Sequence, residues 1–179
     1  MTPVRPREQR LRPLEPAVIA FGSNLGDREA TLRAALDDLA ATPGVRLDAV
    51  SPFIETAAVR PNGVDDDAPR YLNGVALVST ALDPHELLAQ LHRIEHAHGR
   101  VRAERWGDRT LDLDLIAMSG RQVHDDELQL PHPRASEREF VLGPWLTVDP
   151  DAELPELGRV DALLARLRAS DSPATGEAS

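Results

Sequence analysis

The sequence contains no cysteine and no lysine, and only 3% of its 179 residues are aromatic. The absence of cysteine excludes disulfides, thiolate nucleophiles and zinc–thiolate sites. The absence of lysine excludes two common phosphate sites, the P-loop and the strand lysine of protein kinases. Any phosphate chemistry must therefore use arginine, histidine, metal ions and backbone N–H groups.

Long apolar runs are also missing, because no stretch approaches the ~20 residues that a membrane helix needs. The N-terminal segment is charged and has no apolar h-region, so we expect no signal peptide. The net charge of −10, from 20 basic and 30 acidic residues, argues against a general binder of nucleic acid or membrane surfaces. We expect a cytoplasmic monomer.

The chain is long enough for one compact domain with tails. Residues 1–16 are rich in proline and arginine, and we expect a disordered arm there. Residues 17–169 would form the domain, and residues 170–179 a flexible tail.

Hydrophobic periodicity predicts the order of elements inside this domain. The predicted strands cover residues 17–22, 45–56 with a bend near Ser51, 71–80 and 110–118. The predicted helices begin after Asp27 and Asp83, which are good capping residues. This order matches a ferredoxin-like βαββαβ core of the α+β class. Its antiparallel sheet would have both helices on one face and the other face open to a ligand. A helical segment near 138–146 and a helix at 160–167 would be C-terminal additions.

The sequence TLDLDLIAM alternates apolar and acidic residues, which is typical of a strand with two different faces. Leu111, Leu113 and Leu115 would face the core. Asp112 and Asp114 would share the other face, with Cβ atoms roughly 7 Å apart. Carboxylates this close repel each other unless a cation is present, and such hard oxygen ligands suit Mg²⁺. A solvated strand face is the alternative explanation.

Arginine is concentrated just before this strand, beside Trp106, at Arg100, Arg102, Arg105 and Arg109. A guanidinium group can bind phosphate oxygens with two parallel hydrogen bonds. The alternative is a surface run favoured by the C-terminus of a helix. Arginines and paired carboxylates in one stretch together indicate a site for a metal-bound polyphosphate.

Three other features have both a functional and a structural explanation, and we favour the structural one for each. The turn GSNLGD, which begins at Gly22, could cradle phosphate or simply connect a strand to a helix, and it lacks the GK[ST] ending of a P-loop. His92 and His96 have the spacing of a metal-binding helix but no HExxH pattern. The aspartates at 65–67, inside a long predicted loop at 57–70, could bind a metal or form a solvated tip.

Five motifs occur in a characteristic order: GSNLGD, YLN, RWGDRTLDLDL, LPHP and RxFVL. Together they resemble the 6-hydroxymethyl-7,8-dihydropterin pyrophosphokinase family over about residues 17–155. The resemblance implies a Mg²⁺-dependent folate-pathway enzyme that transfers pyrophosphate from ATP to the pterin and releases AMP. Asp108 stands where the family often has proline, His92 where it often has glutamine, and Ala57 and Ala58 where prolines are common.

The resemblance also implies roles for individual residues. Asp112 and Asp114 would hold two Mg²⁺ ions, and Arg100 and Arg109 would neutralise the transferred group as catalytic residues. The implied ATP-binding residues are Glu95, Arg102, Arg105, Trp106, Arg109, Leu115, His132 and Arg138. The implied pterin-binding residues are Thr56, Ala57, Val59, Tyr71, Asn73, Trp106, Asp112 and Phe140.

Two other classes of function remain open. A Mg²⁺-dependent nucleotidyl- or glycosyltransferase would explain the paired aspartates but not Trp106, Phe140 and the YLN strand together. A regulatory module with the same fold would bind ATP or pterin without producing AMP, and a fold alone does not decide function.

Overall fold

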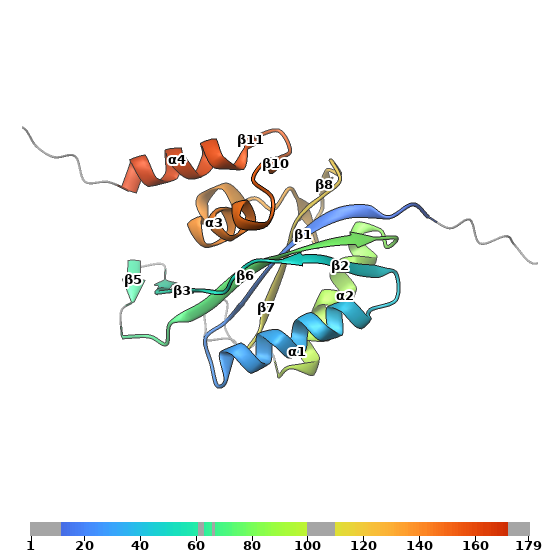
Figure 1. The fold of residues 1–179 in the computed structure, drawn as a ribbon, viewed down its shortest axis with the longest axis horizontal. Coiled ribbons are helices and arrows are strands. Elements are labelled where there is room, and N and C mark those ends of the chain that lie inside the picture. Colours follow the sequence, from blue (N-terminus) through green and yellow to red (C-terminus); the bar gives the residue numbers. More distant parts are fainter. Residues whose placement is uncertain (1–11, 61–62, 66, 100–109, 172–179) are drawn as a thin grey trace, which may run out of the picture.

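The computed structural model describes residues 12–60, 63–65, 67–99 and 110–171. Its centre is an antiparallel sheet with the strand order β2-β6-β1-β7, and a short β3 also pairs with β6 (Figure 1). The strands are β1 (Glu15–Ser23), β2 (Val45–Val50), β3 (Ile54–Thr56), β6 (Tyr71–Thr80) and β7 (Asp112–Met118). The predicted bend near Ser51 is therefore a break between β2 and β3.

Helices α1 (Arg28–Ala41) and α2 (Pro84–Ala97) cover one face of this sheet (Figure 1). Asp27 caps α1 by accepting a hydrogen bond from the N–H of Ala30. Asp83 and Glu86 form a reciprocal capping box at the start of α2, as the sequence predicts. Aliphatic side chains from both helices pack on the sheet and form the larger apolar core.

Helices α3 (Glu139–Val148) and α4 (Val160–Asp171) lie on the opposite face, preceded by a 3₁₀ turn at Ala135–Glu137 (Figure 1). A second apolar cluster joins them to the sheet, and it includes Trp145 at 3% exposure. The prediction that Trp145 packs inward is confirmed. Helices α3 and α4 thus cover part of the face that was expected to be available for a ligand.

Three short hairpins complete the described part of the chain. They are β4 (Ala58–Arg60) with β5 (Gly63–Asp65), β8 (Val123–His124) with β9 (Gln129–Leu130), and β10 (Glu153–Leu154) with β11 (Gly158–Arg159). The first hairpin lies inside the segment predicted as a loop. Within these described residues no helix is long and apolar enough to cross a membrane.

The ends of the ordered elements differ from the predicted ones. Strand β1 begins at Glu15, two residues inside the predicted arm, and Arg12 donates a hydrogen bond to Glu86 at 3.0 Å. Helix α4 continues to Asp171, beyond the predicted end of the helix. Residues 1–11 and 172–179 lie outside the described residues.

Candidate active site

Strand β7 has the two faces that its alternating sequence predicts. Leu111, Leu113 and Leu115 are buried in the core beneath α1 and α2, whereas Asp112 and Asp114 are half-buried on the other side. In the ladder with β1, Asp112 lies opposite Gly22 and Asp114 lies opposite Ala20. Both carboxylates therefore lie on one face, near the end of β7 where the strand begins.

An arginine from the start of α3 pairs with one of these carboxylates. Nη1 of Arg138 donates to Oδ2 of Asp114 at 3.0 Å. The same guanidinium group lies 5.7 Å from the ring centroid of Phe140, within the range of a cation–π contact. Three residues predicted for different parts of the site are thus brought together around Asp114.

His132 lies close to the same pair and is mostly buried. Burial lowers the pKa of His132, with the positive charges of Arg138 and Arg134 acting in the same direction and Asp114 opposing them. Its Nδ1 accepts the backbone N–H of Arg134 at 3.2 Å. The neutral ring therefore carries its proton on Nε2, as the hydrogen-bond pattern requires.

A hollow of about 320 Å³ opens beside Asp114. Its walls come from α2, from β7 and from the segment of β8–β9 that leads to His132, and its lining includes Leu88, His92, Leu115, Leu128 and Gln129. The sequence predicted Leu115 and His132 here. It missed Leu88, although the helical spacing of Leu88 and His92 puts both on one face of α2.

Glu95 is 1% exposed, and its Oε1 accepts the backbone N–H of Leu113 at 2.8 Å. This hydrogen bond fixes β7 at the residue between the two aspartates. The structure thus gives Glu95 a role in positioning the strand, and its direct contact with ATP stays a prediction.

A row of polar residues crosses the sheet next to Asp112. Asn73 of β6 lies opposite both Ile54 and Gly22, and Gly22 lies opposite Asp112. Nδ2 of Asn73 donates to Oγ1 of Thr56 at 2.6 Å, and Thr56 pairs with Tyr71. Four of the residues predicted to bind pterin, Thr56, Tyr71, Asn73 and Asp112, therefore share one face of the sheet. We call these four residues the polar row.

Gly22 allows this row to form. A Cβ atom at Gly22 would lie 2.5 Å from Oδ1 of Asn73, which is closer than real Cβ contacts allow. The interpretation of GSNLGD as a plain turn missed this requirement. Ala57 directly follows Thr56 and is half-buried, and Val59 lies in β4.

The predicted arginine cluster lies outside the described residues. It comprises Arg100, Arg102, Arg105, Trp106 and Arg109, together with Asp108. The site described above therefore consists of the sheet face, the start of α3 and the hollow beside α2.

The donor set suits a hard divalent cation. Asp112 and Asp114 offer carboxylate oxygens from one face, and one oxygen of Asp114 is shared with Arg138. Among the described residues, no group of three His, Cys, Asp or Glu side chains is placed to hold a metal. A pair of carboxylates fits Mg²⁺, which usually combines one or two protein carboxylates with phosphate oxygens and water.

Comparisons with known proteins identify the family to which the chain is similar. A model of the family described as 7,8-dihydro-6-hydroxymethylpterin-pyrophosphokinase (HPPK) matches residues 18–150. A Methylorubrum extorquens protein named 2-amino-4-hydroxy-6-hydroxymethyldihydropteridine pyrophosphokinase is 44% identical, over 75% of this chain and 83% of its own. The protein of the same name from Pseudomonas aeruginosa is 41% identical, over 82% of this chain and 88% of its own.

Solved structures support the fold. An HPPK-DHPS in complex with substrates has a TM-score of 0.69 at 13% identity, over 88% of this chain and 44% of that chain. A Plasmodium falciparum HPPK-DHPS variant has a TM-score of 0.66 at 14% identity, over 94% of this chain and 49% of that chain. This chain thus spans less than half of those longer chains. From the family match and the identity to its relatives, the chain belongs to the 7,8-dihydro-6-hydroxymethylpterin-pyrophosphokinase family.

Proposed function

We propose that this protein transfers pyrophosphate from ATP to 6-hydroxymethyl-7,8-dihydropterin in folate biosynthesis. The hydroxymethyl oxygen of the pterin attacks the β-phosphorus of ATP and gives up its proton to solvent, the bond between that phosphorus and the α-phosphate oxygen breaks, and AMP leaves. The main support is the arrangement of Asp112 and Asp114 between a polar row on the sheet and a hollow beside α2. This geometry supports a site in which a cation lies between an acceptor and a nucleotide.

The hollow is the proposed site of the nucleoside part of ATP. Leu88, Leu115 and Leu128 provide apolar walls that suit a flat base, and His132 presents an Nε2–H donor near Asp114. Arg138, held beside Asp114, would neutralise phosphate charge at the mouth of the hollow. Glu95 acts through β7, whose position it fixes.

The polar row is the proposed site of the pterin. The side chains of Asn73 and Thr56 can form hydrogen bonds with the polar atoms along the edge of a heterocycle. Phe140 offers a flat apolar surface for the ring of the pterin. Arg138 contacts the Phe140 ring and also pairs with Asp114, so it links this surface to the carboxylate. The acceptor and the nucleotide would then approach Asp112 and Asp114 from opposite sides.

Asp112 and Asp114 would hold Mg²⁺, with two ions expected when ATP is bound. When bound, the metal polarises phosphate oxygens and lowers the pKa of an alcohol. Phosphoryl-type transfer depends mainly on positioning and neutralisation of charge. The proposed roles of Arg100, Arg102, Arg105, Trp106 and Arg109 follow from the family resemblance and add to this neutralisation.

We also propose the ferredoxin-like plan for the core. The four long strands lie in the order β2-β6-β1-β7, each neighbouring pair is antiparallel, and α1 and α2 follow β1 and β6. A split βαβ arrangement has this order. Helices α3 and α4 are the C-terminal additions, which turn the second face into a partly covered site.

The decisive experiment separates the enzyme from a binding module. Phosphorus NMR would follow ATP and Mg²⁺ with and without 6-hydroxymethyl-7,8-dihydropterin, in the wild type and in Asp112→Asn. We expect AMP and a pterin diphosphate that form only when pterin is present, and a strong loss of both in the variant. Tight binding of ATP and pterin without AMP would instead indicate a binding module.

A further inference from the structure

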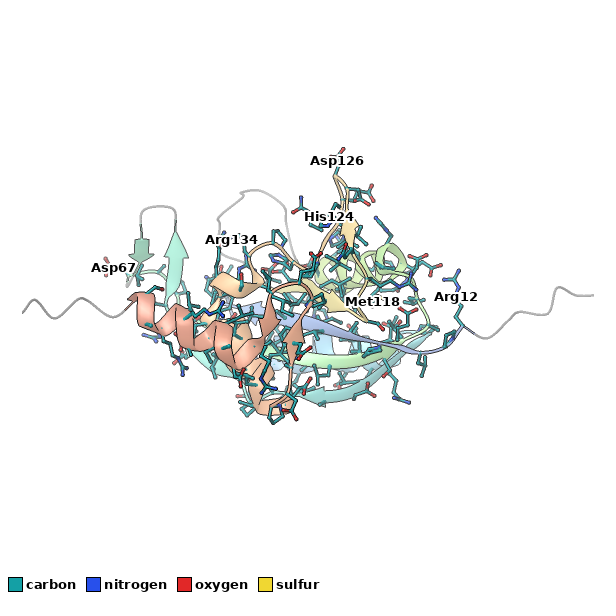
Figure 2. The ribbon with its side chains drawn as sticks, turned by 90° about the horizontal axis from the view of Figure 1, so that it is seen from above. Arg12, Asp67, Met118, His124, Asp126 and Arg134 are labelled. Atoms are coloured by element: carbon teal, nitrogen blue, oxygen red, sulfur yellow. The ribbon has the colours of Figure 1, made fainter. Side chains whose placement is uncertain are left out.

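One wall of the hollow beside α2 is a hairpin that projects from the molecule. Strands β8 and β9 pair through Val123 with Leu130 and His124 with Gln129. Figure 2 shows Asp126 at the far end of this projection and His124 nearer its base. Leu130 of β9 and Leu128 of the turn are both buried in the main core and anchor the hairpin there. The turn between the two strands, residues 125–128, supplies part of the lining of the hollow.

Asp125 connects this turn to helix α2. Its Oδ1 accepts the backbone N–H groups of Glu127 and Leu128 at 2.9 and 2.8 Å, which shapes the turn. Its Oδ2 lies 2.9 Å from Nε2 of His85 in the first turn of α2. One oxygen of the Asp125 carboxylate therefore makes hydrogen bonds within the hairpin, and the other makes a hydrogen bond between the hairpin and the helix.

His85 belongs to the face of α2 that lines the hollow. Leu88 follows His85 by three residues and His92 follows Leu88 by four, which are helical spacings, and both Leu88 and His92 line the hollow. The first turn of α2 is itself fixed, because Asp83 and Glu86 cap each other's backbone N–H groups. His85 is thus a hydrogen-bond donor at a capped helix end, and it faces a turn whose residues 125–127 are exposed.

We propose that His85 and Asp125 are a positioning pair that sets the distance between α2 and the β8–β9 turn, and with it the width of the nucleotide hollow. This inference rests on the nucleotide-binding role proposed above. Neither residue belongs to the family motifs. The pair acts on the nucleotide mainly through Leu88, Leu128 and Gln129, which line the hollow on its two sides, and Asp125 also lines the hollow itself.

The energetic effect should be modest and specific. Both side chains are 45% exposed, and an exposed ion pair or hydrogen bond typically changes an equilibrium by about two- to fivefold. Loss of the pair leaves the polar row at Asn73 and the carboxylates of β7 in place. We therefore expect weaker binding of nucleotide with unchanged binding of pterin.

The test measures the affinity for Mg²⁺-bound α,β-methylene-ATP by calorimetry, together with KM for ATP, KM for pterin and kcat. His85→Ala should weaken nucleotide binding and raise KM for ATP about threefold, with kcat and KM for pterin unchanged. His85→Gln, which keeps an N–H donor, should restore most of the affinity. His96→Ala, on an exposed position of the same helix, is the matched control and should bind as the wild type does.

A double-mutant cycle makes the test specific to the pair. Asp125→Ser keeps one short oxygen for the turn but cannot also reach His85. The double variant with His85→Ala should bind nucleotide no more weakly than the weaker single variant. Additive losses, or wild-type affinity in His85→Ala, would overturn the proposal. Because binding is measured without turnover, this result is independent of whether AMP is formed.

Discussion

The two faces of the central sheet differ in what fills them. Toward α1 and α2, aliphatic side chains form one continuous core. Toward α3 and α4, an apolar cluster around Trp145 covers part of the sheet. The polar side chains of Thr56, Tyr71, Asn73, Asp112 and Asp114 lie on the remainder of that face. Strand β7 contributes to both faces: Asp112 and Asp114 lie on the polar side, whereas Leu113 and Leu115 are buried in the core and reach the hollow at its edge. Substitutions one residue apart should therefore have separable effects.

The largest expected effect is on the polar side, at Asp114. Asp114→Ala removes a proposed metal ligand and the partner of Arg138, and we expect AMP formation to fall by about 10²–10³-fold. The unfolding temperature should change little, because the carboxylate is only partly buried. A steady-state assay of AMP with a thermal unfolding curve checks both parts.

Asp37→Ala is the matched control for this substitution. Asp37 is exposed on α1, on the far side of the sheet, so the same change of charge should leave activity intact. An Asp114→Ala protein that keeps more than about a tenth of wild-type activity would contradict the electrostatic role assigned to this residue.

The second-largest expected effect concerns Leu113, which precedes Asp114 and faces the opposite side of β7. Leu113 is 4% exposed in the main core, and truncation to alanine should lower the free energy of unfolding by about 2–4 kcal/mol. The hydrogen bond from its backbone N–H to Glu95 does not involve the side chain, so the folded variant should keep most of its kcat. KM for ATP should rise, because the Leu113 side chain also lines the hollow.

Urea unfolding and activity at a temperature where Leu113→Ala is folded test this separation. Leu157→Ala, at a side chain that is 49% exposed, should have little effect on stability. If folded Leu113→Ala lost activity as severely as Asp114→Ala, the two faces of β7 would not be independent.

The sequence predicted the long elements of both faces well. Capping residues and apolar periodicity located α1 and α2, and strict alternation assigned the leucines and aspartates of β7 to their faces. These signals are local, because they depend on residues three or four apart in a helix and two apart in a strand. The same local signal explains why Trp145 was correctly expected to face inward.

The sequence could not predict contacts between distant segments. The hollow combines α2, β7 and a hairpin whose strands have only two residues each, too short for a periodic pattern. The partner of Glu95 is a backbone N–H 18 residues away. Coverage of the second face by α3 and α4 depends on how the chain returns after β7, which no local pattern encodes.

A smaller effect should follow from crowding the polar row. In Gly22→Ala, the new Cβ would lie 2.5 Å from Oδ1 of Asn73, so the amide must move away from Thr56. We expect KM for pterin to rise about three- to tenfold, the usual value of one hydrogen bond, while KM for ATP stays constant. Gly143→Ala in α3, where nothing lies within 4 Å, is the control. Equal changes in both KM values would show that Gly22 shapes the whole site rather than the pterin side.

The smallest expected effect is a pH dependence at His132, between the polar row and the hollow. Burial lowers its pKa, so below the ordinary histidine pKa of about 6.5 the unfolded chain binds a proton that the folded protein does not. Stability should therefore fall as pH decreases from about 6.5 toward the lowered folded pKa, by at most about 1.4 kcal/mol per pH unit. Above that range this histidine does not make the free energy of unfolding depend on pH.

Free energies of unfolding measured at several pH values should decline less steeply in His132→Gln than in the wild type. His124→Gln, at an exposed position, should retain the wild-type dependence. An unchanged pH dependence in His132→Gln would mean that other groups cause the decline, and that burial does not lower the pKa of His132.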